Sequence, residues 1–106
     1  MTDVGACSPS VVTLPAEIDL TSLARAYAGL NAAISSGAAV VIADFSATMF
    51  CDVAGIRRLL ELHEQAAARQ VELRVVAPPG PVRRLLRLVE PGQPIRISSS
   101  LGTAGS

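Results

Sequence analysis

Short, β-branched apolar runs alternate with longer segments of helical periodicity along most of this chain, and no other feature constrains the fold as tightly. The runs lie at residues 11–14, 38–43, 71–75 and 95–97 and are rich in Val and Ile, as buried or half-buried strands are. Pro15 should break or bulge the strand that the first run begins. The second run has no polar residue, which is typical of a central strand covered by helices on both faces.

The intervening segments repeat their apolar residues every three or four positions, which is the period of an amphipathic helix. The first helix should begin at residue 21 or 22, and the third at Pro81. The second should span residues 52–70, with Arg57 and Glu61 placed to pair. The expected buried stripes are Leu23, Tyr27, Leu30 and Ile34 in the first helix, Ile56, Leu59, Leu60, His63, Ala66 and Ala67 in the second, and Val82, Leu85, Leu86 and Val89 in the third.

This order of strands and helices gives a mainly parallel sheet with right-handed crossovers. We therefore predict one α/β domain at residues 11–97, with a four- to five-stranded sheet and helices packed against it. Residues 1–10 should form a tail or a short first strand, and residues 98–106 a flexible Ser/Gly-rich tail. Because parallel strands end at one edge, Asp19 and the loop at residues 46–52 should meet at the carboxyl edge, where open α/β sheets bind ligands.

Composition removes several classes of function. Nine basic residues, all arginine, balance nine acidic ones, so no net field attracts nucleic acid or an anionic membrane. The absence of lysine excludes Schiff-base chemistry and a Walker-type phosphate site. Cys7 and Cys51 form neither a metal-ligand spacing nor a disulfide framework, and no signal peptide or membrane-spanning run is present. We expect a cytoplasmic protein without cofactor or metal, and with no nucleic-acid or membrane partner.

Asp52 and Gly55 open the second helix and are the candidate site residues with the clearest physical rationale. An Asp before a helix can accept hydrogen bonds from the first free amides, which needs no further function. Gly55 in the first turn costs about 1 kcal/mol relative to alanine, so something approaches the backbone there, either a ligand or a neighbouring loop. Cys51 beside them is interpreted as a small buried hydrophobe, with a redox sensor as the alternative.

Several segments resemble, in order, the motifs of STAS domains, the small bacterial anti-sigma factor antagonists. Residues 14–20 (Leu-Pro-Ala-Glu-Ile-Asp-Leu) are similar to the strand that ends in Gly-Glu-Ile-Asp in the family. Residues 41–46 (Val-Ile-Ala-Asp-Phe-Ser) resemble its Val-Asp-Leu-Ser strand, and residues 50–56 (Phe-Cys-Asp-Val-Ala-Gly-Ile) resemble its Asp-Ser-x-Gly segment. The match continues to residue 97, so it covers nearly the whole predicted domain.

The resemblance implies a non-enzymatic module that binds a kinase-like anti-sigma factor and so regulates sigma-factor-dependent transcription. In the family, phosphorylation of the serine in the Asp-Ser-x-Gly motif ends the interaction, but here Val53 holds that position as a degenerate phosphosite. Ala16 also replaces a family glycine, and both ends look trimmed, which would expose a sheet edge and favour a homodimer. The partner-binding residues carried over, with Arg57 added from the helix that follows, are Asp19, Asp52, Val53, Ala54, Gly55 and Arg57.

Other candidates remain open beside this interpretation. Ser46 and Thr48 offer alternative phosphosites, although hydroxyls in such loops usually bond to the local backbone. A phospho-receiver or a magnesium-dependent phosphatase-like enzyme would use Asp19, Asp44 and Asp52. A small-ligand-sensing STAS module would use the same edge of the sheet. We interpret His63 as a packed or boundary residue. The arginines of the third helix form either a solvated face or a surface for an acidic partner, and these are Arg83, Arg84 and Arg87.

Overall fold

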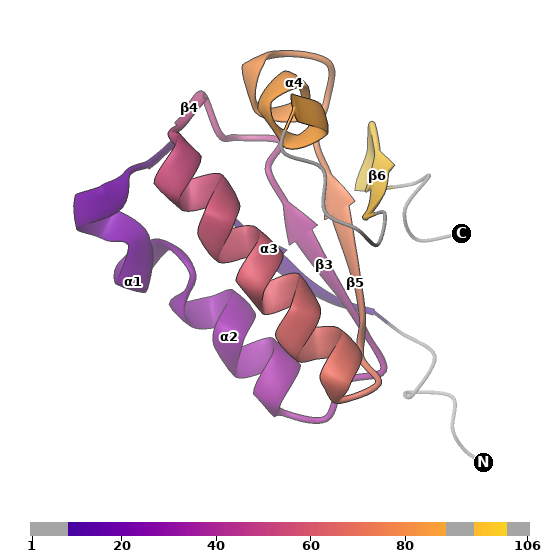
Figure 1. The fold of residues 1–106 in the computed structure, drawn as a ribbon. Coiled ribbons are helices and arrows are strands. Elements are labelled where there is room, and N and C mark those ends of the chain that lie inside the picture. Colours follow the sequence, from indigo (N-terminus) through magenta and orange to yellow (C-terminus); the bar gives the residue numbers. More distant parts are fainter. Residues whose placement is uncertain (1–8, 89–94, 102–106) are drawn as a thin grey trace.

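The computed structural model describes residues 9–88 and 95–101 of the 106-residue chain. Four parallel strands form the main sheet in the order β1-β3-β5-β6 (Figure 1). Their bounds are Ser10–Thr13 for β1, Val40–Asp44 for β3, Glu72–Val76 for β5 and Arg96–Ser98 for β6. The predicted single α/β domain with a mainly parallel sheet is therefore confirmed. Of the tails predicted at residues 1–10 and 98–106, residues 1–8 and 102–106 lie outside the described part of the chain, whereas Ser10 begins β1 and Ser98 ends β6.

A second, two-stranded parallel sheet pairs β2 (Glu17–Ile18) with β4 (Phe50–Cys51). Pro15 lies between β1 and β2 and interrupts the first strand as predicted. The prediction of a loop at residues 46–52 was wrong in part, because Phe50 and Cys51 pair with Glu17 and Ile18. A two-residue strand is too short to show a periodic pattern in the sequence. Strand β4 forms only because the chain comes back beside β2 and pairs with it.

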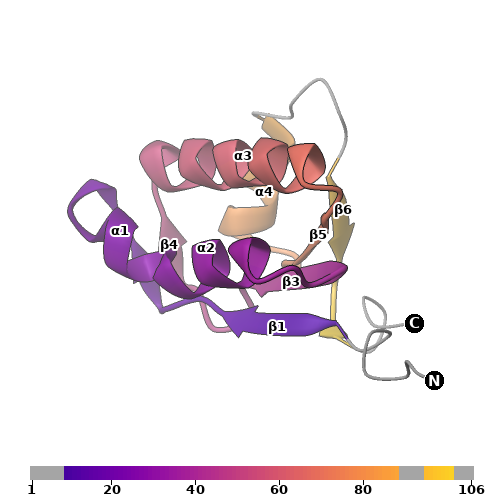
Figure 2. The same cartoon turned by 90° about the horizontal axis from the view of Figure 1, so that it is seen from below.

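The helices are the 3₁₀ turn η2 (Leu20–Ser22), α1 (Leu23–Ala26), α2 (Ala28–Ser35), α3 (Val53–Ala68) and α4 (Pro81–Leu88). The first predicted helix is thus divided at Tyr27, and its last turn is followed by Gly37 with a φ of 91°. Helices α2 and α3 lie side by side over one face of the main sheet (Figures 1 and 2). In the described residues, no helix is both long and apolar enough to cross a membrane.

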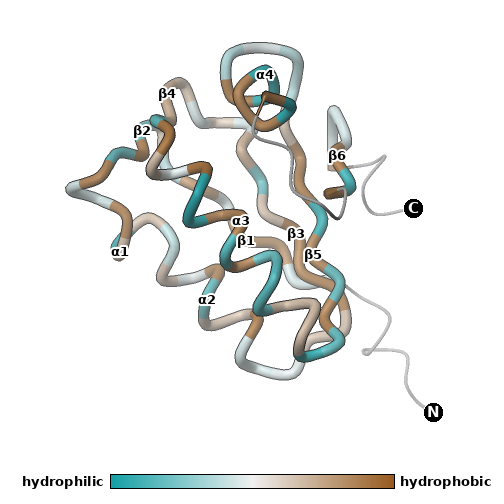
Figure 3. The backbone as a smooth tube through the Cα atoms, in the orientation of Figure 1, coloured by the Kyte–Doolittle hydropathy of each residue, from teal (hydrophilic) through white to brown (hydrophobic). Residues whose placement is uncertain are grey.

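Helix α3 is amphipathic, with hydrophobic and hydrophilic residues alternating along it in Figure 3. Its buried residues are Gly55, Ile56, Leu59, Leu62 and Ala66. The predicted stripe was wrong at Ala67, which is exposed, whereas Leu60 and His63 are half-buried at its boundary. The step from Leu59 to Leu62 keeps the apolar face on the sheet. The ion pair also differs from prediction, because Arg58, not Arg57, contacts Glu61 at 2.9 Å.

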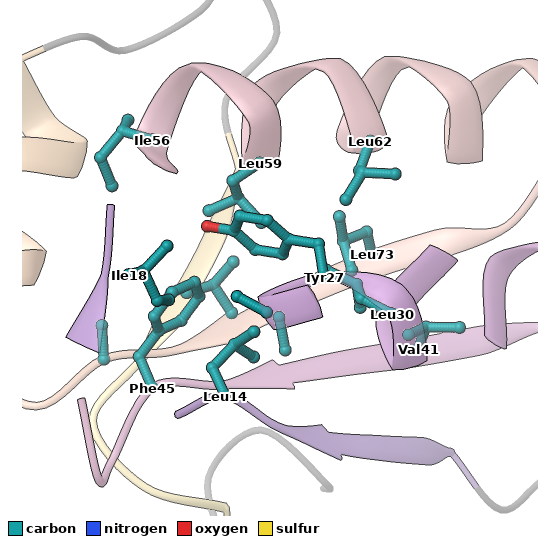
Figure 4. Close-up of a cluster of buried hydrophobic side chains, with 14 of the residues drawn as sticks. Leu14, Ile18, Tyr27, Leu30, Val41, Phe45, Ile56, Leu59, Leu62 and Leu73 are labelled. Carbon is teal, nitrogen blue, oxygen red and sulfur yellow. The ribbon is translucent and has the colours of Figure 1, made fainter. Parts of the chain in front are cut away.

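The core fills the space between these helices and the sheet, as Figure 4 shows for its largest side chains. Strand β3 is central, and Val41, Ile42 and Ala43 are each almost fully buried, which confirms the predicted buried central strand. The carboxyl ends of β3, β5 and β6 lie together at one edge of the main sheet. The Phe45 amide there donates to the Val76 carbonyl, and the Ala77 amide donates to the Ser98 carbonyl.

Candidate functional site at the start of helix α3

Asp52 joins two segments that lie 32 residues apart in the sequence. Its Oδ1 accepts a hydrogen bond from the Gly55 amide at 2.9 Å, which makes it the N-cap of α3. Its Oδ2 accepts a hydrogen bond from the Leu20 amide at 3.2 Å, at the beginning of η2. Asp52 therefore fixes the start of α3 against the β2–η2 segment, in addition to the predicted capping.

Asp19 has a similar but separate role on the neighbouring segment. Its Oδ1 accepts hydrogen bonds from the amides of Thr21 and Ser22 at 3.1 Å each and from the Thr21 hydroxyl at 2.8 Å. The Ser22 hydroxyl accepts a hydrogen bond from the Asp19 amide, which completes a capping box. The hydrogen bond from the Thr21 hydroxyl is the largest cause that lowers the pKa of the Asp19 carboxyl, so the carboxylate is favoured.

Gly55 is buried, and its neighbours explain why glycine occupies the position. A Cβ atom there would lie 2.6 Å from Cys51 Sγ and 3.0 Å from Ile18 Cγ2, closer than side chains pack. The Tyr27 hydroxyl also donates a 2.8 Å hydrogen bond to the Gly55 carbonyl (Figure 4 shows this hydroxyl near the start of α3). The close approach predicted from sequence is therefore made by strands β2 and β4 and by Tyr27.

Cys51 lies behind this turn with 8% of its surface exposed. Burial, and then the charge of Asp52, raise the pKa of its thiol to about 11. A thiol with such a pKa holds almost no thiolate at neutral pH and reacts slowly. These properties favour the small buried hydrophobe over the redox sensor.

Exposed apolar side chains surround the first turn of α3. Val53 is 46% exposed, Phe50 51%, Leu20 70% and Met49 78%. We call these four residues the α3-start surface. Ala54 is half-buried beside them, and Arg57 is exposed one turn further along the helix. Apolar patches on a small protein mark interaction sites when they gather in one place.

A groove of about 280 Å³ continues this surface towards α4. It is mainly apolar, and Leu88, 75% exposed, lies at its α4 side. We call it the α4 groove, and it is lined by Met49, Phe50, Cys51, Pro81, Arg84, Leu85 and Leu88. Leu20, Met49, Phe50 and Leu88 were not predicted as site residues, because the spacing of an apolar residue does not show whether its side chain stays outside the core.

The hydroxyls proposed as alternative phosphosites are both used by the loop itself. Ser46 donates a short hydrogen bond from its hydroxyl to Asp44 Oδ1, which also accepts from the Ser46 amide. The Thr48 hydroxyl donates to the Pro15 carbonyl at 2.8 Å. Each interaction tightens the turn that leads from β3 to β4.

The three acids of the proposed enzyme have separate partners. Asp44 is 6% exposed and bonds to Ser46, whereas Asp19 and Asp52 cap different helices. Across residues 9–88 and 95–101, no group of three His, Cys, Asp or Glu side chains could hold a metal ion. The gathering of Asp19, Asp44 and Asp52 that this alternative required is not formed.

The remaining candidate residues lie away from the turn. His63 is half-buried, and burial is the largest cause that lowers its pKa. Arg83 does not simply face water, because its Nη1 donates to the Ser99 hydroxyl at 2.8 Å. Arg84 lines the α4 groove, and Arg87 is exposed on the same helix.

The chain is thus a small α/β domain in which a glycine-bearing helix start is capped by Asp52. The STAS domain model matches residues 3–104, and the chain belongs to the STAS domain family. A comparison with curated protein sequences gives no match.

Two solved structures are similar to the whole chain. One is the anti-sigma factor antagonist SpoIIAA in its unphosphorylated form, 20% identical, covering 98% of this chain and 89% of that one with a TM-score of 0.67. The other is the Bacillus cell fate determinant SpoIIAA in the phosphorylated form, 19% identical, covering 92% of this chain and 88% of that one with a TM-score of 0.65. At this identity the likeness shows a shared fold.

Proposed function

We propose that this protein is an anti-sigma factor antagonist that binds a kinase-like anti-sigma factor in the cytoplasm and has no catalytic activity of its own. The observation that carries the proposal is the exposure of Leu20, Met49, Phe50 and Val53 around one helix start. Burying such side chains against a partner is worth about 25 cal/mol per Å² of apolar surface. Family membership and the likeness to an anti-sigma factor antagonist support this partner class.

The α4 groove extends the proposed contact surface. Leu88 and Met49 provide apolar contacts on its two sides, and Arg84 provides a positive charge. Arginine is enriched at the centre of protein interfaces because it combines an apolar stem with several hydrogen-bond donors. The surface therefore suits a partner segment with apolar side chains and an acidic flank.

The proposed interaction lacks a phosphorylation switch at Val53. The side chain of Val53 has no hydroxyl to receive a phosphoryl group, and its β-branched shape keeps the helix start in the unmodified geometry. A phosphoserine at this position would place about 1.5 to 2 negative charges next to Asp52 on an apolar surface. Valine leaves the surface permanently ready to bind.

A phosphorylation assay tests the missing switch. The full chain is incubated with a kinase-like anti-sigma factor and γ-labelled ATP. We expect no label on the wild type. The new hydroxyl of Val53→Ser should receive the γ-phosphoryl group of ATP, with ADP as the other product. Val53→Ala, which also lacks a hydroxyl, is the control and should stay unlabelled. Phosphate found on Ser46 or Thr48 of the wild type, together with loss of partner binding, would overturn the proposal of an unswitched module.

A binding assay tests the surface itself. Val53→Asp and Leu88→Asp should each weaken anti-sigma factor binding by at least ~10-fold, because interface hot spots contribute about 2 kcal/mol or more. Val53→Asp should not harm folding, since an acid at a helix N-terminus is favourable. Ala67→Asp, exposed at the other end of α3, is the matched control and should bind like the wild type. Equal binding by all three variants would refute the proposed surface.

A further inference from the structure

Strand β1 is an edge of the main sheet, and half of its backbone hydrogen-bonding groups face outwards. Among the strands of residues 9–88 and 95–101 it pairs with β3 alone, and the Leu14 amide that follows it donates to the Asp44 carbonyl. In this parallel register, Val12 bonds to β3, so the amides and carbonyls of Val11 and Thr13 point to the open side. No partner for these groups is found among the described residues.

The open edge has few of the features that usually protect one. Its sequence Ser-Val-Val-Thr carries no charge, and Val11 is 46% exposed. Natural edge strands are normally blunted by lysine, proline, a bulge or a covering element. Here Pro9 and Pro15 stand just outside the strand and leave residues Ser10–Thr13 free to pair between them.

A groove of about 480 Å³ runs beside this edge, between β1 and helices α1 and α2. Gly29 forms part of its wall, where a Cβ atom would come within 3.3 Å of Val12 Cγ1. The groove shares no residue with the α4 groove, and it is lined by Val12, Thr13, Leu14, Pro15, Glu17, Ser22, Arg25, Ala26 and Gly29.

We propose that the β1 edge is a self-association site, at which a second copy of this chain adds its own β1 in antiparallel orientation. A two-fold axis beside Val12 would pair Val11 with Thr13 of the second copy and Thr13 with Val11 of the second copy. These residues present outward amides and carbonyls in both copies, so the two pairs make about four backbone hydrogen bonds. The contact is isologous and closes with two copies.

The position of α2 favours a second copy over a foreign extended segment. Helix α2 packs on both β1 and β3, so its axis lies about one strand spacing, ~5 Å, from the two-fold axis. The two α2 helices would then lie ~10 Å apart, within the distance at which helices pack. Figure 2 shows α2 above β1 at this edge. The side chains there are small, with Ala28, Gly29 and Ala32 exposed.

The contact area sets the strength of association. Four-residue strands alone would bury too little for a stable dimer, which needs ~800 Å² from each partner, and α2 provides the remainder. Because the exposed residues of α2 at this edge are small and bury little apolar surface, the dimer should be weak, with a dissociation constant of roughly 1 to 100 µM. Such a dimer leaves the α3-start surface free, since none of its residues lines the groove of about 480 Å³ beside β1.

Sedimentation equilibrium of the full chain from ~5 µM to ~1 mM tests the proposal over the expected range of dissociation constants. We expect dimer to increase with concentration. Val11→Pro removes an outward amide but none that β3 uses, so it should shift the protein to monomer, while Val11→Ala keeps the amide and should still dimerise. Gly29→Lys places two like charges in the shared groove and should also be monomeric, without relying on a proline that could disturb folding.

Amide hydrogen exchange gives a second readout with residue resolution. On dimerisation, Val11 and Thr13 should gain protection at high concentration, whereas the Leu14 amide is already bonded and should not change. A wild type that stays monomeric up to ~1 mM overturns the proposal. Binding of a foreign extended segment to the edge of such a monomer would not rescue it. A dimer that neither Val11→Pro nor Gly29→Lys weakens overturns it as well.

Discussion

Replacing Gly55 by alanine should destabilise the protein, although alanine is the better helix former. The added Cβ would lie 2.6 Å from Cys51 Sγ and 3.0 Å from Ile18 Cγ2. Both neighbours are buried, at 8% and 0% exposure, so neither can move into solvent without opening the core. The carbonyl that accepts the Tyr27 hydroxyl bond would move with the helix start.

The magnitude follows from two opposed effects. Alanine in place of glycine favours a helix by about 1 kcal/mol at most. Adding a methyl group to a well-packed core costs about 1–3 kcal/mol, and a 2.6 Å contact belongs at the upper end of that range. We expect a net loss of about 1–2 kcal/mol in the free energy of unfolding, which for a domain of this size lowers the Tm by roughly 4–12 °C.

Urea unfolding followed by circular dichroism measures this loss, and a double-mutant cycle identifies its cause. Cys51→Ala removes the Sγ atom that makes the shorter contact, so Gly55→Ala should cost less in that background by about 1 kcal/mol. Two results would refute the reasoning. One is a Gly55→Ala variant as stable as the wild type, and the other is the same cost with and without the sulfur.

Three further predictions concern the same turn. Asp52→Ala removes the cap of α3 and the acceptor of the Leu20 amide, and should lower the free energy of unfolding by about 1–3 kcal/mol; a change below ~0.5 kcal/mol in urea titrations would contradict both roles. Burial raises the pKa of Tyr27, the sole tyrosine, above its unfolded value of ~10. Its contribution to stability should therefore be complete below pH ~10 and be lost as the pH rises further, and absorbance at ~295 nm should show no tyrosinate before unfolding. With a thiol pKa of about 11, Cys51 in a Cys7→Ser variant should react with a thiol reagent at pH ~8 only when urea unfolds the chain, and rapid labelling of the folded protein would contradict its burial.

The strands and the amphipathic helices could be read from the sequence because each has a local cause. The run that became β3 is apolar at every position up to Asp44, and α3 repeats its apolar residues over sixteen positions. Capping by Asp52 and a close approach at Gly55 were also predictable, since both rest on the chemistry of one residue type. What approaches Gly55 was left open, because Cys51, Ile18 and Tyr27 reach it through three separate elements.

Exposure was harder to predict than secondary structure. Leu20 and Leu88 are the same residue type as the core leucines. Only the direction of their side chains in the folded chain leaves them 70% and 75% exposed. Strand β4 escaped prediction because its pairing with β2 joins residues more than thirty positions apart. The enzyme alternative failed for the same kind of reason, since proximity at a sheet edge does not bring three carboxylates to one point.

The sequence by itself determined the alternation of strands and helices, the parallel sheet that follows from it and the valine at the start of α3. These depend on local periodicity, on chain chirality and on residue identity. Only the tertiary structure decided that Asp52 also holds the Leu20 amide, that Met49 and Phe50 remain outside the core, and that no strand of the described residues pairs with the outer side of β1. Each of these depends on which distant segments pack together, and no local pattern in a chain records that.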